Sequence, residues 1–340
     1  MTNMLGRSFR PWGLLPWVLH GLSVNRWAFV GAVSPEDRCH AAWSDLRSMK
    51  GADQHFFFQI SDLPVGSWAA ESEERLARSR EFANTAHVSD SCIVARRIDA
   101  KHAEIIEPIR AFIASGVRDI IIDCSSLPKR FFFPIVKELI LTEGTQIPNI
   151  IAVYTRPAGY ASGSLAIDPQ PWHPLPRFMP PVPKPRDALY VVGLGYDPLG
   201  LPQLLADQEI GPDSIKLLFP FPADPPGYRR NWEFVRQLEP NLGESFHEPI
   251  RVNGYDVAEV YERITSLADE GRRYVVFAPY GPKPMSLAMC IYASMHDNTS
   301  AVYYTQPKAY NPSYSYGVKE VCGQRQVYAY CLRLGGRNLY

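Results

Sequence analysis

Two stretches of the chain decide its fold: residues 119–133, Asp-Ile-Ile-Ile-Asp-Cys-Ser-Ser-Leu-Pro-Lys-Arg-Phe-Phe-Phe, and residues 273–287, Arg-Tyr-Val-Val-Phe-Ala-Pro-Tyr-Gly-Pro-Lys-Pro-Met-Ser-Leu. Each starts with an apolar run typical of a buried strand, passes through a turn that ends in Pro-Lys, and continues with the apolar spacing of a helix. The same order at two places indicates that the chain repeats itself.

The flanking sequence repeats as well. A predicted helix that ends in glycine precedes each stretch, over residues 103–116 and 257–271. A further strand follows each stretch, and the motif Tyr-Thr-x-Pro-x-x-Tyr comes after it, at 154–160 and 304–310. Any two α/β domains share a strand-turn-helix rhythm, but the shared tyrosine motif favours an internal duplication.

The alternation of apolar strands with helices predicts an α/β fold with two duplicated Rossmann-like parallel-sheet units joined by a Pro-rich linker. The segment between the units contains eight prolines and is typical of a stiff spacer. We expect four parts: a poorly ordered N-terminal segment over 1–25, a first unit over 26–167, the linker over 168–186 and a second unit over 187–340.

Composition limits the function. Lys plus Arg and Asp plus Glu both number 35, and this neutral balance excludes a protein that coats nucleic acid through bulk charge. The six cysteines form no CxxC pair, so no metal site is expected, and no cofactor motif is present. No segment is apolar enough to predict a membrane span, and cysteine usage favours the cytoplasm.

Ligands of parallel α/β sheets bind beyond the carboxyl ends of the strands, where the repeated turns are predicted to lie. A turn of small residues before a helix presents free N–H groups, and a lysine in the first helical turn is best explained by a bound anion. The turns therefore predict two phosphate-binding half-sites, one with Ser125, Ser126 and Lys129 and the other with Gly281 and Lys283. The alternative is that Pro-Lys only starts a helix.

The tyrosine motifs predict a second set of ligand contacts. Their rings can stack on bases and their polar neighbours can hydrogen-bond, although tyrosines after a strand serve equally well in packing. The candidates are Tyr154, Thr155, Arg156 and Tyr160 in the first copy, and Tyr304, Thr305, Gln306 and Tyr310 in the second.

Other candidates have weaker signals. Gly193 and Gly195 follow the first strand of the second unit, but their spacing is not that of a dinucleotide fingerprint. Asp123, at a strand end, is a weak candidate for a catalytic carboxylate or a capping group. The catalytic residues, if there are any, stay unknown at this point.

The segment 277–288, Phe-Ala-Pro-Tyr-Gly-Pro-Lys-Pro-Met-Ser-Leu-Ala, is similar to the Gly-Thr-Lys turn of CARF domains. Two such units in one chain resemble the CARF and SAVED ligand-sensing domains of prokaryotic antiviral systems. The resemblance implies a nucleotide or cyclic oligonucleotide ligand held between the two halves. Because no nuclease or protease domain is appended, it implies either a separate effector protein or a degenerate or ring-opening activity in the chain's own pocket.

Three hypotheses follow. The leading one is a sensor or regulatory module that binds a phosphate-bearing nucleotide. The second is an enzyme acting on a nucleoside or sugar phosphate, with Asp123, Ser125 and Ser126 as candidates. The third is an interaction or scaffold protein without a ligand. The sequence does not determine whether the protein forms a homodimer.

Overall fold

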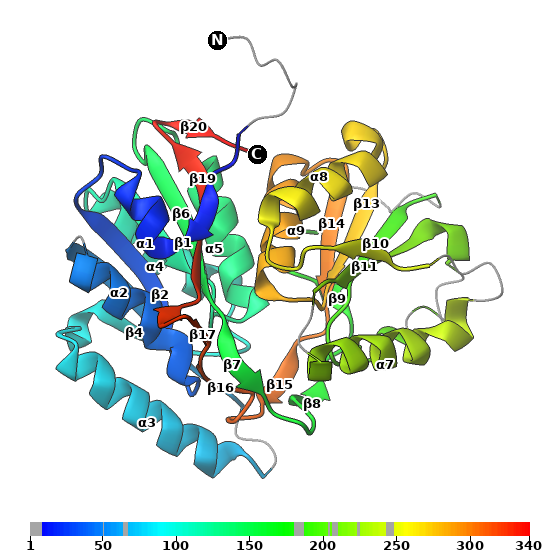
Figure 1. Cartoon of the computed structure of the whole chain (residues 1–340), viewed down its shortest axis with the longest axis horizontal. Helices are drawn as coiled ribbons and strands as arrows, with labels where there is room; N and C mark the ends of the chain where they lie inside the picture. The colour runs from blue at the N-terminus through cyan, green and yellow to red at the C-terminus, as the bar shows by residue number, and fades with distance from the viewer. Residues whose placement is uncertain are drawn as a thin grey trace. The chain divides into compact units, whose positions relative to one another are not determined.

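The chain divides into two compact units in the computed structural model, which describes residues 9–49, 51–63, 67–179, 187–202, 205, 210–222, 225–242 and 248–340. The first unit comprises Met1–Ile167 together with Lys308–Tyr340, and the second comprises Asp168–Pro307 (Figure 1).

The first unit is built on a sheet whose five parallel strands follow the order β4-β3-β2-β5-β6. Strand β19 pairs antiparallel with β6 and extends the sheet, β1 pairs antiparallel with β19 beyond it, and β20 also pairs with β19. The strands are β1 (Trp12–Leu14), β2 (Trp27–Val33), β3 (Ala52–Ser61), β4 (Ile93–Arg97), β5 (Asp119–Asp123), β6 (Asn149–Thr155), β19 (Val327–Leu334) and β20 (Arg337–Asn338).

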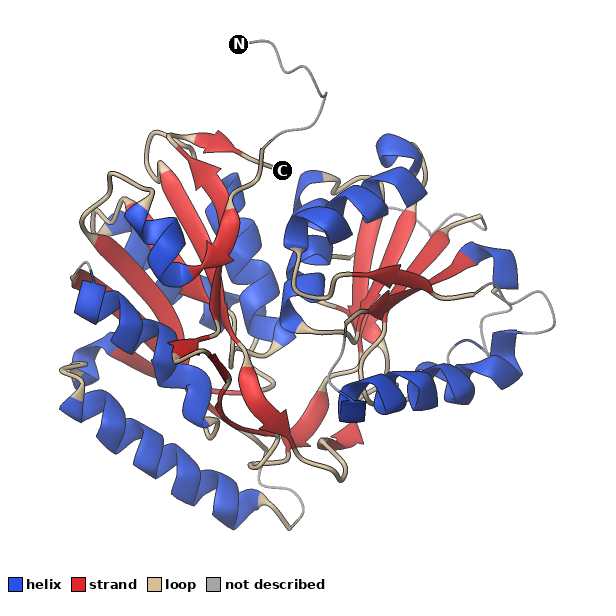
Figure 2. Cartoon of the chain, viewed as in Figure 1, coloured by secondary structure: helices blue, strands red, loops and turns tan. Residues whose placement is uncertain are grey.

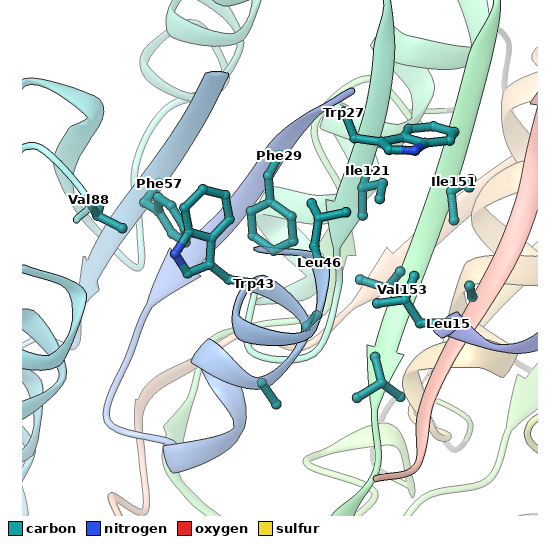
Figure 3. Packing of buried hydrophobic residues seen from close by; sticks show 14 of the residues in the cluster. Leu15, Trp27, Phe29, Trp43, Leu46, Phe57, Val88, Ile121, Ile151 and Val153 are labelled. Carbon is teal, nitrogen blue, oxygen red and sulfur yellow. The ribbon is translucent and has the colours of Figure 1, made fainter. Parts of the chain in front are cut away.

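Helices cover both faces of this sheet (Figure 2) because its central strands are apolar on both sides. On one face Phe29, Ile121 and Ile151 pack with Trp43 of α2 and Leu15 of α1 (Figure 3). Helices α4 and α5 pack together on the other face. The helices are α1 (Leu15–His20), η1 (Asp37–His40), α2 (Ala41–Met49), α3 (Ala69–Thr85), η2 (Asp90–Cys92), α4 (His102–Ala114) and α5 (Lys129–Leu141).

The second unit repeats the same plan. Its sheet has the order β12-β11-β10-β13-β14-β9, in which all neighbours are parallel except β9 on β14. Its strands are β9 (His173–Pro174), β10 (Leu189–Gly193), β11 (Ile215–Pro220), β12 (Ile250–Val252), β13 (Val275–Pro279) and β14 (Ser300–Tyr304). Its helices include η3 (Pro212–Ser214), α7 (Pro225–Leu242), α8 (Val257–Leu267), η4 (Asp269–Gly271) and α9 (Lys283–Met295).

Corresponding strands of the two units occupy corresponding places. With strands counted along the chain from β2 and from β10, both parallel sheets read 3-2-1-4-5, the order of a Rossmann-like sheet. The predicted fold class is therefore confirmed. In both units a helix that begins at the predicted Pro-Lys pair, α5 or α9, follows the fourth strand.

The expected boundaries of the units are wrong at the C-terminus. Residues 308–340 belong to the first unit, because β19 inserts between β6 and β1 and its residues Val327, Ala329 and Cys331 are buried in that core. Four short strands precede β19 in the chain. Strand β15 (Pro307–Tyr310) pairs with β8 (Ala166–Pro169), β16 (Ser315–Val318) pairs with β7 (Pro157–Tyr160), and β17 (Glu320–Val321) and β18 (Gln324–Arg325) form a hairpin.

The expected disorder over 1–25 is also wrong where the structure describes that segment. Strand β1 pairs with β19, Trp12 stacks on Tyr330, and Leu15 and Leu19 are fully buried. Residues 1–8 of this prediction lie outside the described residues. The apolar residues of this segment are ordered because they pack on the edge strand β19 and on the core, and such tertiary packing cannot be read from the local sequence.

The predicted spacer over 168–186 begins as part of the second unit. Strand β9 covers the free edge of β14, and Leu175 and Phe178 are buried. The Leu175 N–H donates to the Val302 carbonyl at 2.8 Å, and the Val302 N–H donates to the Phe178 carbonyl at 3.0 Å. Proline suits such an edge, where its missing N–H costs no ladder bond. Residues 180–186 of the prediction lie outside the described residues.

None of the helices in the described part of the chain combines the length and the apolarity that a membrane span requires.

Candidate functional site

The candidate sites lie where the strand order of each parallel sheet reverses, at the carboxyl ends of β2 and β5 in the first unit and of β10 and β13 in the second. Loops diverge at such a point, which is why α/β proteins bind ligands there.

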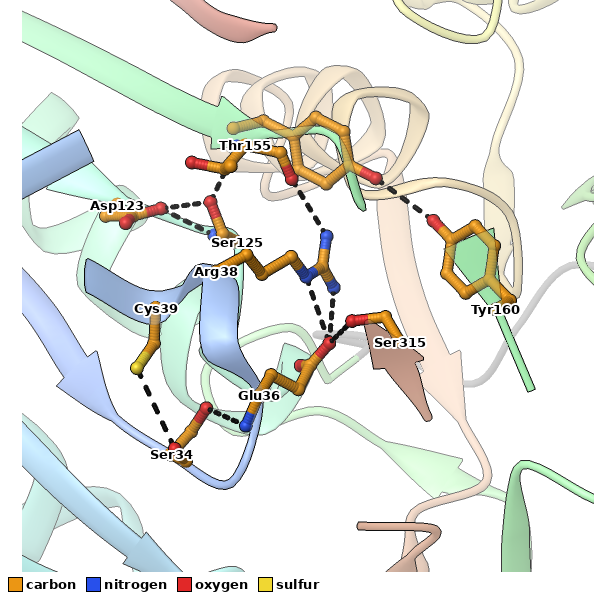
Figure 4. A network of polar contacts seen from close by, with 10 residues as sticks. Ser34, Glu36, Arg38, Cys39, Asp123, Ser125, Thr155, Tyr160 and Ser315 are labelled. Carbon is orange, nitrogen blue, oxygen red and sulfur yellow. Dashed lines mark hydrogen bonds and ion pairs between the residues drawn. The ribbon is translucent and has the colours of Figure 1, made fainter. Parts of the chain in front are cut away.

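In the first unit the predicted turn is closed by its own hydrogen bonds (Figure 4). The Asp123 carboxylate accepts from the Ser125 N–H at 2.8 Å and from the Ser125 hydroxyl. The Ser125 oxygen in turn accepts from the Thr155 N–H at 2.7 Å. All three residues are buried, so these bonds tie the end of β5 to the end of β6. Asp123 therefore caps the turn that follows β5.

Arg38 is the main residue of this site that the sequence did not indicate. It belongs to η1, directly after β2, and only 3% of its side chain is exposed. Its Nη1 donates to the Thr155 carbonyl at 3.0 Å, and its Nε and Nη2 lie 3.0 and 2.9 Å from Glu36 Oε2. Its guanidinium also lies 5.5 Å from the Tyr154 ring centroid. Burial alone lowers the pKa of Arg38, but Glu36 and the tyrosines outweigh it, so the pKa is raised and the charge is kept.

Four tyrosines of the first unit form a chain of hydroxyl and ring contacts beside Arg38. The hydroxyls of Tyr154 and Tyr160 are 3.2 Å apart, and the Tyr160 ring packs edge-on against Tyr314 at 5.8 Å. Tyr310 packs edge-on against Tyr314 at 5.9 Å. Tyr154, Tyr160 and Tyr310 were predicted as ligand contacts in two different copies, and the structure brings them together in one unit. Burial raises the pKa of Tyr314 and keeps it neutral.

In the second unit the two turns at the reversal point pack backbone against backbone. A Cβ atom on Gly195 would lie 2.1 Å from the Tyr280 carbonyl oxygen, and one on Gly281 would lie 3.0 Å from the Leu194 carbonyl oxygen. The Asn231 side chain of α7 donates to the Gly195 carbonyl at 2.7 Å. The glycines are needed because the turns approach each other closely.

The remaining predicted residues of this turn pack around Tyr280. The hydroxyls of Tyr280 and Thr305 are 3.0 Å apart, and the Tyr304 ring lies 5.4 Å from the Tyr280 ring. Burial raises the pKa of Tyr280. Gly193 faces α9, since a Cβ atom there would lie 2.9 Å from Met285 Sδ. Tyr304 and Thr305 are thus core residues of the second unit.

The two predicted lysines both begin a helix but differ in exposure. Lys129 opens α5 and is buried, with 8% of its surface exposed, whereas Lys283 opens α9 and is only partly buried. Neither helix has an acidic residue in its first turn.

The remaining three predicted ligand residues are Ser126, Arg156 and Gln306. Ser126 is partly exposed after Ser125. Arg156 exchanges backbone hydrogen bonds with Gln326 and Lys319 in the first unit. Gln306 is fully buried in the second unit, and its Nε2 donates to the Pro307 carbonyl at 3.1 Å.

One sequence signal could have pointed to Arg38. The run Ser34-Pro-Glu-Asp-Arg-Cys-His40 follows the first strand directly and reads as a helix start at the expected ligand edge. In the second unit Tyr196 follows the Gly195 turn, and the Arg230 guanidinium of α7 lies 4.7 Å from its ring centroid. In the described ranges no group of three or more His, Cys, Asp or Glu residues could hold a metal ion.

Comparisons with known proteins find distant structural likeness only. No family model matches the chain, and no curated protein matches it. A universal stress protein from Archaeoglobus fulgidus DSM 4304 is 8% identical with a TM-score of 0.24, covering 82% of this chain and 96% of that one. The cytoplasmic domain of a prokaryotic cation chloride cotransporter is 11% identical with a TM-score of 0.24, covering 84% and 96%.

A third solved structure, the sirohydrochlorin chelatase SirB from Bacillus subtilis subspecies spizizenii in complex with cobalt, is 10% identical with a TM-score of 0.20, covering 85% and 91%. At such TM-scores these likenesses carry no argument about function.

Proposed function

We propose that the protein is a sensor or regulatory module that binds a phosphate-bearing nucleotide, and that the second unit holds the phosphate. The observation that carries this proposal is the start of α9 at the strand-order reversal of the second sheet, with a partly buried Lys283 in its first turn. The first N–H groups of a helix attract anions, and an added lysine is unfavourable there unless an anion is bound.

The neighbouring turn supports the same ligand class. Tyr196 and Arg230 stand beside the Gly195 turn, and Gly195 itself packs on Tyr280 at the start of the turn that leads to α9. An aromatic ring with a guanidinium beside it suits a nucleobase or a further phosphate. A cyclic oligonucleotide, a role in prokaryotic antiviral defence and a separate effector protein remain part of the proposal.

The two units are unequal in this proposal. In the first unit the donor hydroxyl of Ser125 is used by Asp123, and Lys129 is buried. A partly exposed lysine can meet a ligand from solution, whereas a buried lysine cannot do so without a local rearrangement. We therefore assign the phosphate to Lys283 and a supporting role to the turn of Ser125.

The first experiment is a thermal-shift assay of the full chain with a panel of mononucleotides, dinucleotides and cyclic oligonucleotides. A ligand at about 100 times its Kd stabilises the folded state by about 2.7 kcal/mol and raises the Tm by several degrees. Lys283→Ala is expected to weaken binding about tenfold or more and to remove most of this rise, since it deletes a charge-assisted bond to phosphate.

The matched control is Arg273→Ala, which also deletes one cation of the second unit but lies just before β13, at the opposite edge of the sheet. It should retain the shift. The absence of any shift across the whole panel, or equal shifts in wild type and Lys283→Ala, would overturn the assignment.

A further inference from the structure

We propose that Arg38 forms an anion-binding site in the first unit, that the chain's own Glu36 fills this site, and that an incoming phosphate group displaces Glu36. The inference concerns a different unit from the phosphate site on Lys283 and does not depend on it.

Three donors converge on one oxygen of Glu36 (Figure 4). Arg38 Nε and Nη2 lie 3.0 and 2.9 Å from Glu36 Oε2, and the Ser315 hydroxyl of β16 donates to the same atom. A guanidinium normally binds a carboxylate through two parallel bonds to both oxygens. Here both N–H groups share a single oxygen, so a phosphate that offers two oxygens to the guanidinium would gain a bond that Glu36 does not make.

The rest of the site holds Arg38 in place whether or not Glu36 is present. Its Nη1 is fixed by the Thr155 carbonyl, and its guanidinium lies by the Tyr154 ring. The Thr155 backbone is in turn held by Ser125. A buried cation positioned this way needs a counter-ion, because an unpaired buried charge is strongly unfavourable.

Glu36 is the more accessible partner of the pair. Its side chain is 16% exposed against 3% for Arg38, and it lies in a loop next to the exposed Asp37. A soluble anion can therefore reach the position of the Glu36 carboxylate by replacing it. Glu36 supplies the carboxylate that is ion-paired with Arg38, so it is the anion that a ligand must displace.

Displacement would have a structural consequence inside the first unit. The Glu36–Ser315 hydrogen bond joins the loop after β2 to β16, across 279 positions of sequence. Strand β16 pairs with β7, in the register Ser315 to Tyr160. Displacement of Glu36 would break its hydrogen bond to Ser315, which is one of the contacts that hold β16 and β7. Anion binding would therefore make this strand pair more mobile.

The test compares wild type with Glu36→Ala in the full chain, using inorganic phosphate and pyrophosphate as probes. Glu36→Ala should lower the Tm without added anion and regain stability in phosphate. Calorimetry should show binding at least about tenfold tighter than to wild type, which corresponds to about 1.4 kcal/mol. The double variant Glu36→Ala, Arg38→Met should lose this gain in affinity, and Asp37→Ala should behave as wild type.

Glu36→Gln provides a second measurement in case the alanine variant does not fold. It keeps an acceptor for Ser315 but removes the competing charge, so it should also bind phosphate more tightly than wild type. A folded Glu36→Ala or Glu36→Gln protein with wild-type phosphate affinity would overturn the proposal. Combining Glu36→Gln with Lys283→Ala separates the sites, because gained phosphate binding that survives this change belongs to Arg38.

Discussion

Two titratable side chains of the first unit, the buried His40 and the partly buried Asp62, respond to loss of solvent in opposite directions. Burial lowers the pKa of His40 to about 4 and raises that of Asp62 to about 6. The Asp62 carboxylate accepts from the Tyr310 N–H at 3.2 Å and from the Ser72 hydroxyl at 3.5 Å, and these bonds offset only part of its desolvation. As the pH falls, protonation of His40 therefore lowers the free energy of unfolding, whereas protonation of Asp62 raises it.

Asp62→Asn should isolate the contribution of this carboxylate to the pH dependence of the free energy of unfolding. The folded protein binds the Asp62 proton near pH 6 and the unfolded chain near 3.8, so this group stabilises the fold at low pH and loses that effect as the pH rises through 6. From about pH 7.5 to about pH 4.5, wild type should gain on the order of 2 kcal/mol over Asp62→Asn in urea unfolding. Asp187→Asn, at an exposed position, should track wild type. Parallel curves for wild type and Asp62→Asn would contradict the assignment.

At the scale of elements, the sequence predicts the strands and helix starts that depend on the local pattern of apolar residues. The strands β5 and β13 and the starts of α5 and α9 at Pro-Lys could be read from apolar spacing. The place of Arg38 could not, since its partner Thr155 lies in a strand far along the chain, as does Ser315, which donates to its ion-pair partner Glu36. The same limit applies to Gly195, whose neighbour Tyr280 belongs to a turn that only the folded sheet brings close.

Gly195→Ala should therefore destabilise the second unit. The new methyl group would lie 2.1 Å from the Tyr280 carbonyl oxygen, and backbone cannot move aside as a flexible side chain can. Overpacking of this kind costs about 1 to 3 kcal/mol, or more against rigid backbone. Gly211→Ala is the matched control in the same unit, because nothing lies within 4 Å of its added Cβ and its φ is not positive. Denaturant unfolding that places both variants at the same midpoint would refute the backbone contact.

At the scale of the whole molecule, the duplication was predictable and the boundary was not. The repeat ends at Tyr310, and the alternation of Val327, Ala329 and Cys331 predicts a strand without saying which sheet it joins. Each fifth parallel strand, β6 or β14, needs a partner on its outer edge. In the second unit the Pro-rich segment supplies it as β9, and in the first unit the C-terminal segment supplies it as β19.

Ala329→Asp tests this division in the intact chain. Ala329 is fully buried in β19, between Gly13 of β1 and Val153 of β6, so a carboxylate there has no room and no counter-ion. Hydrogen exchange should show loss of protection in first-unit strands such as 119–123 and 149–155. Strands 189–193 and 275–279 of the second unit should keep theirs, since domains with separate cores open separately.

The control for Ala329→Asp comes from the same C-terminal segment, and the opposite outcome would appear in different peptides. Val321→Asp, on the exposed β17–β18 hairpin of the same C-terminal segment, should leave exchange in both units unchanged. If residues 308–340 stabilised the second unit, as the repeat alone suggested, Ala329→Asp would expose 189–193 and 275–279 and spare the first unit. Because the two outcomes involve different peptides, the experiment assigns the C-terminal strand to one sheet even when the variant is strongly destabilised.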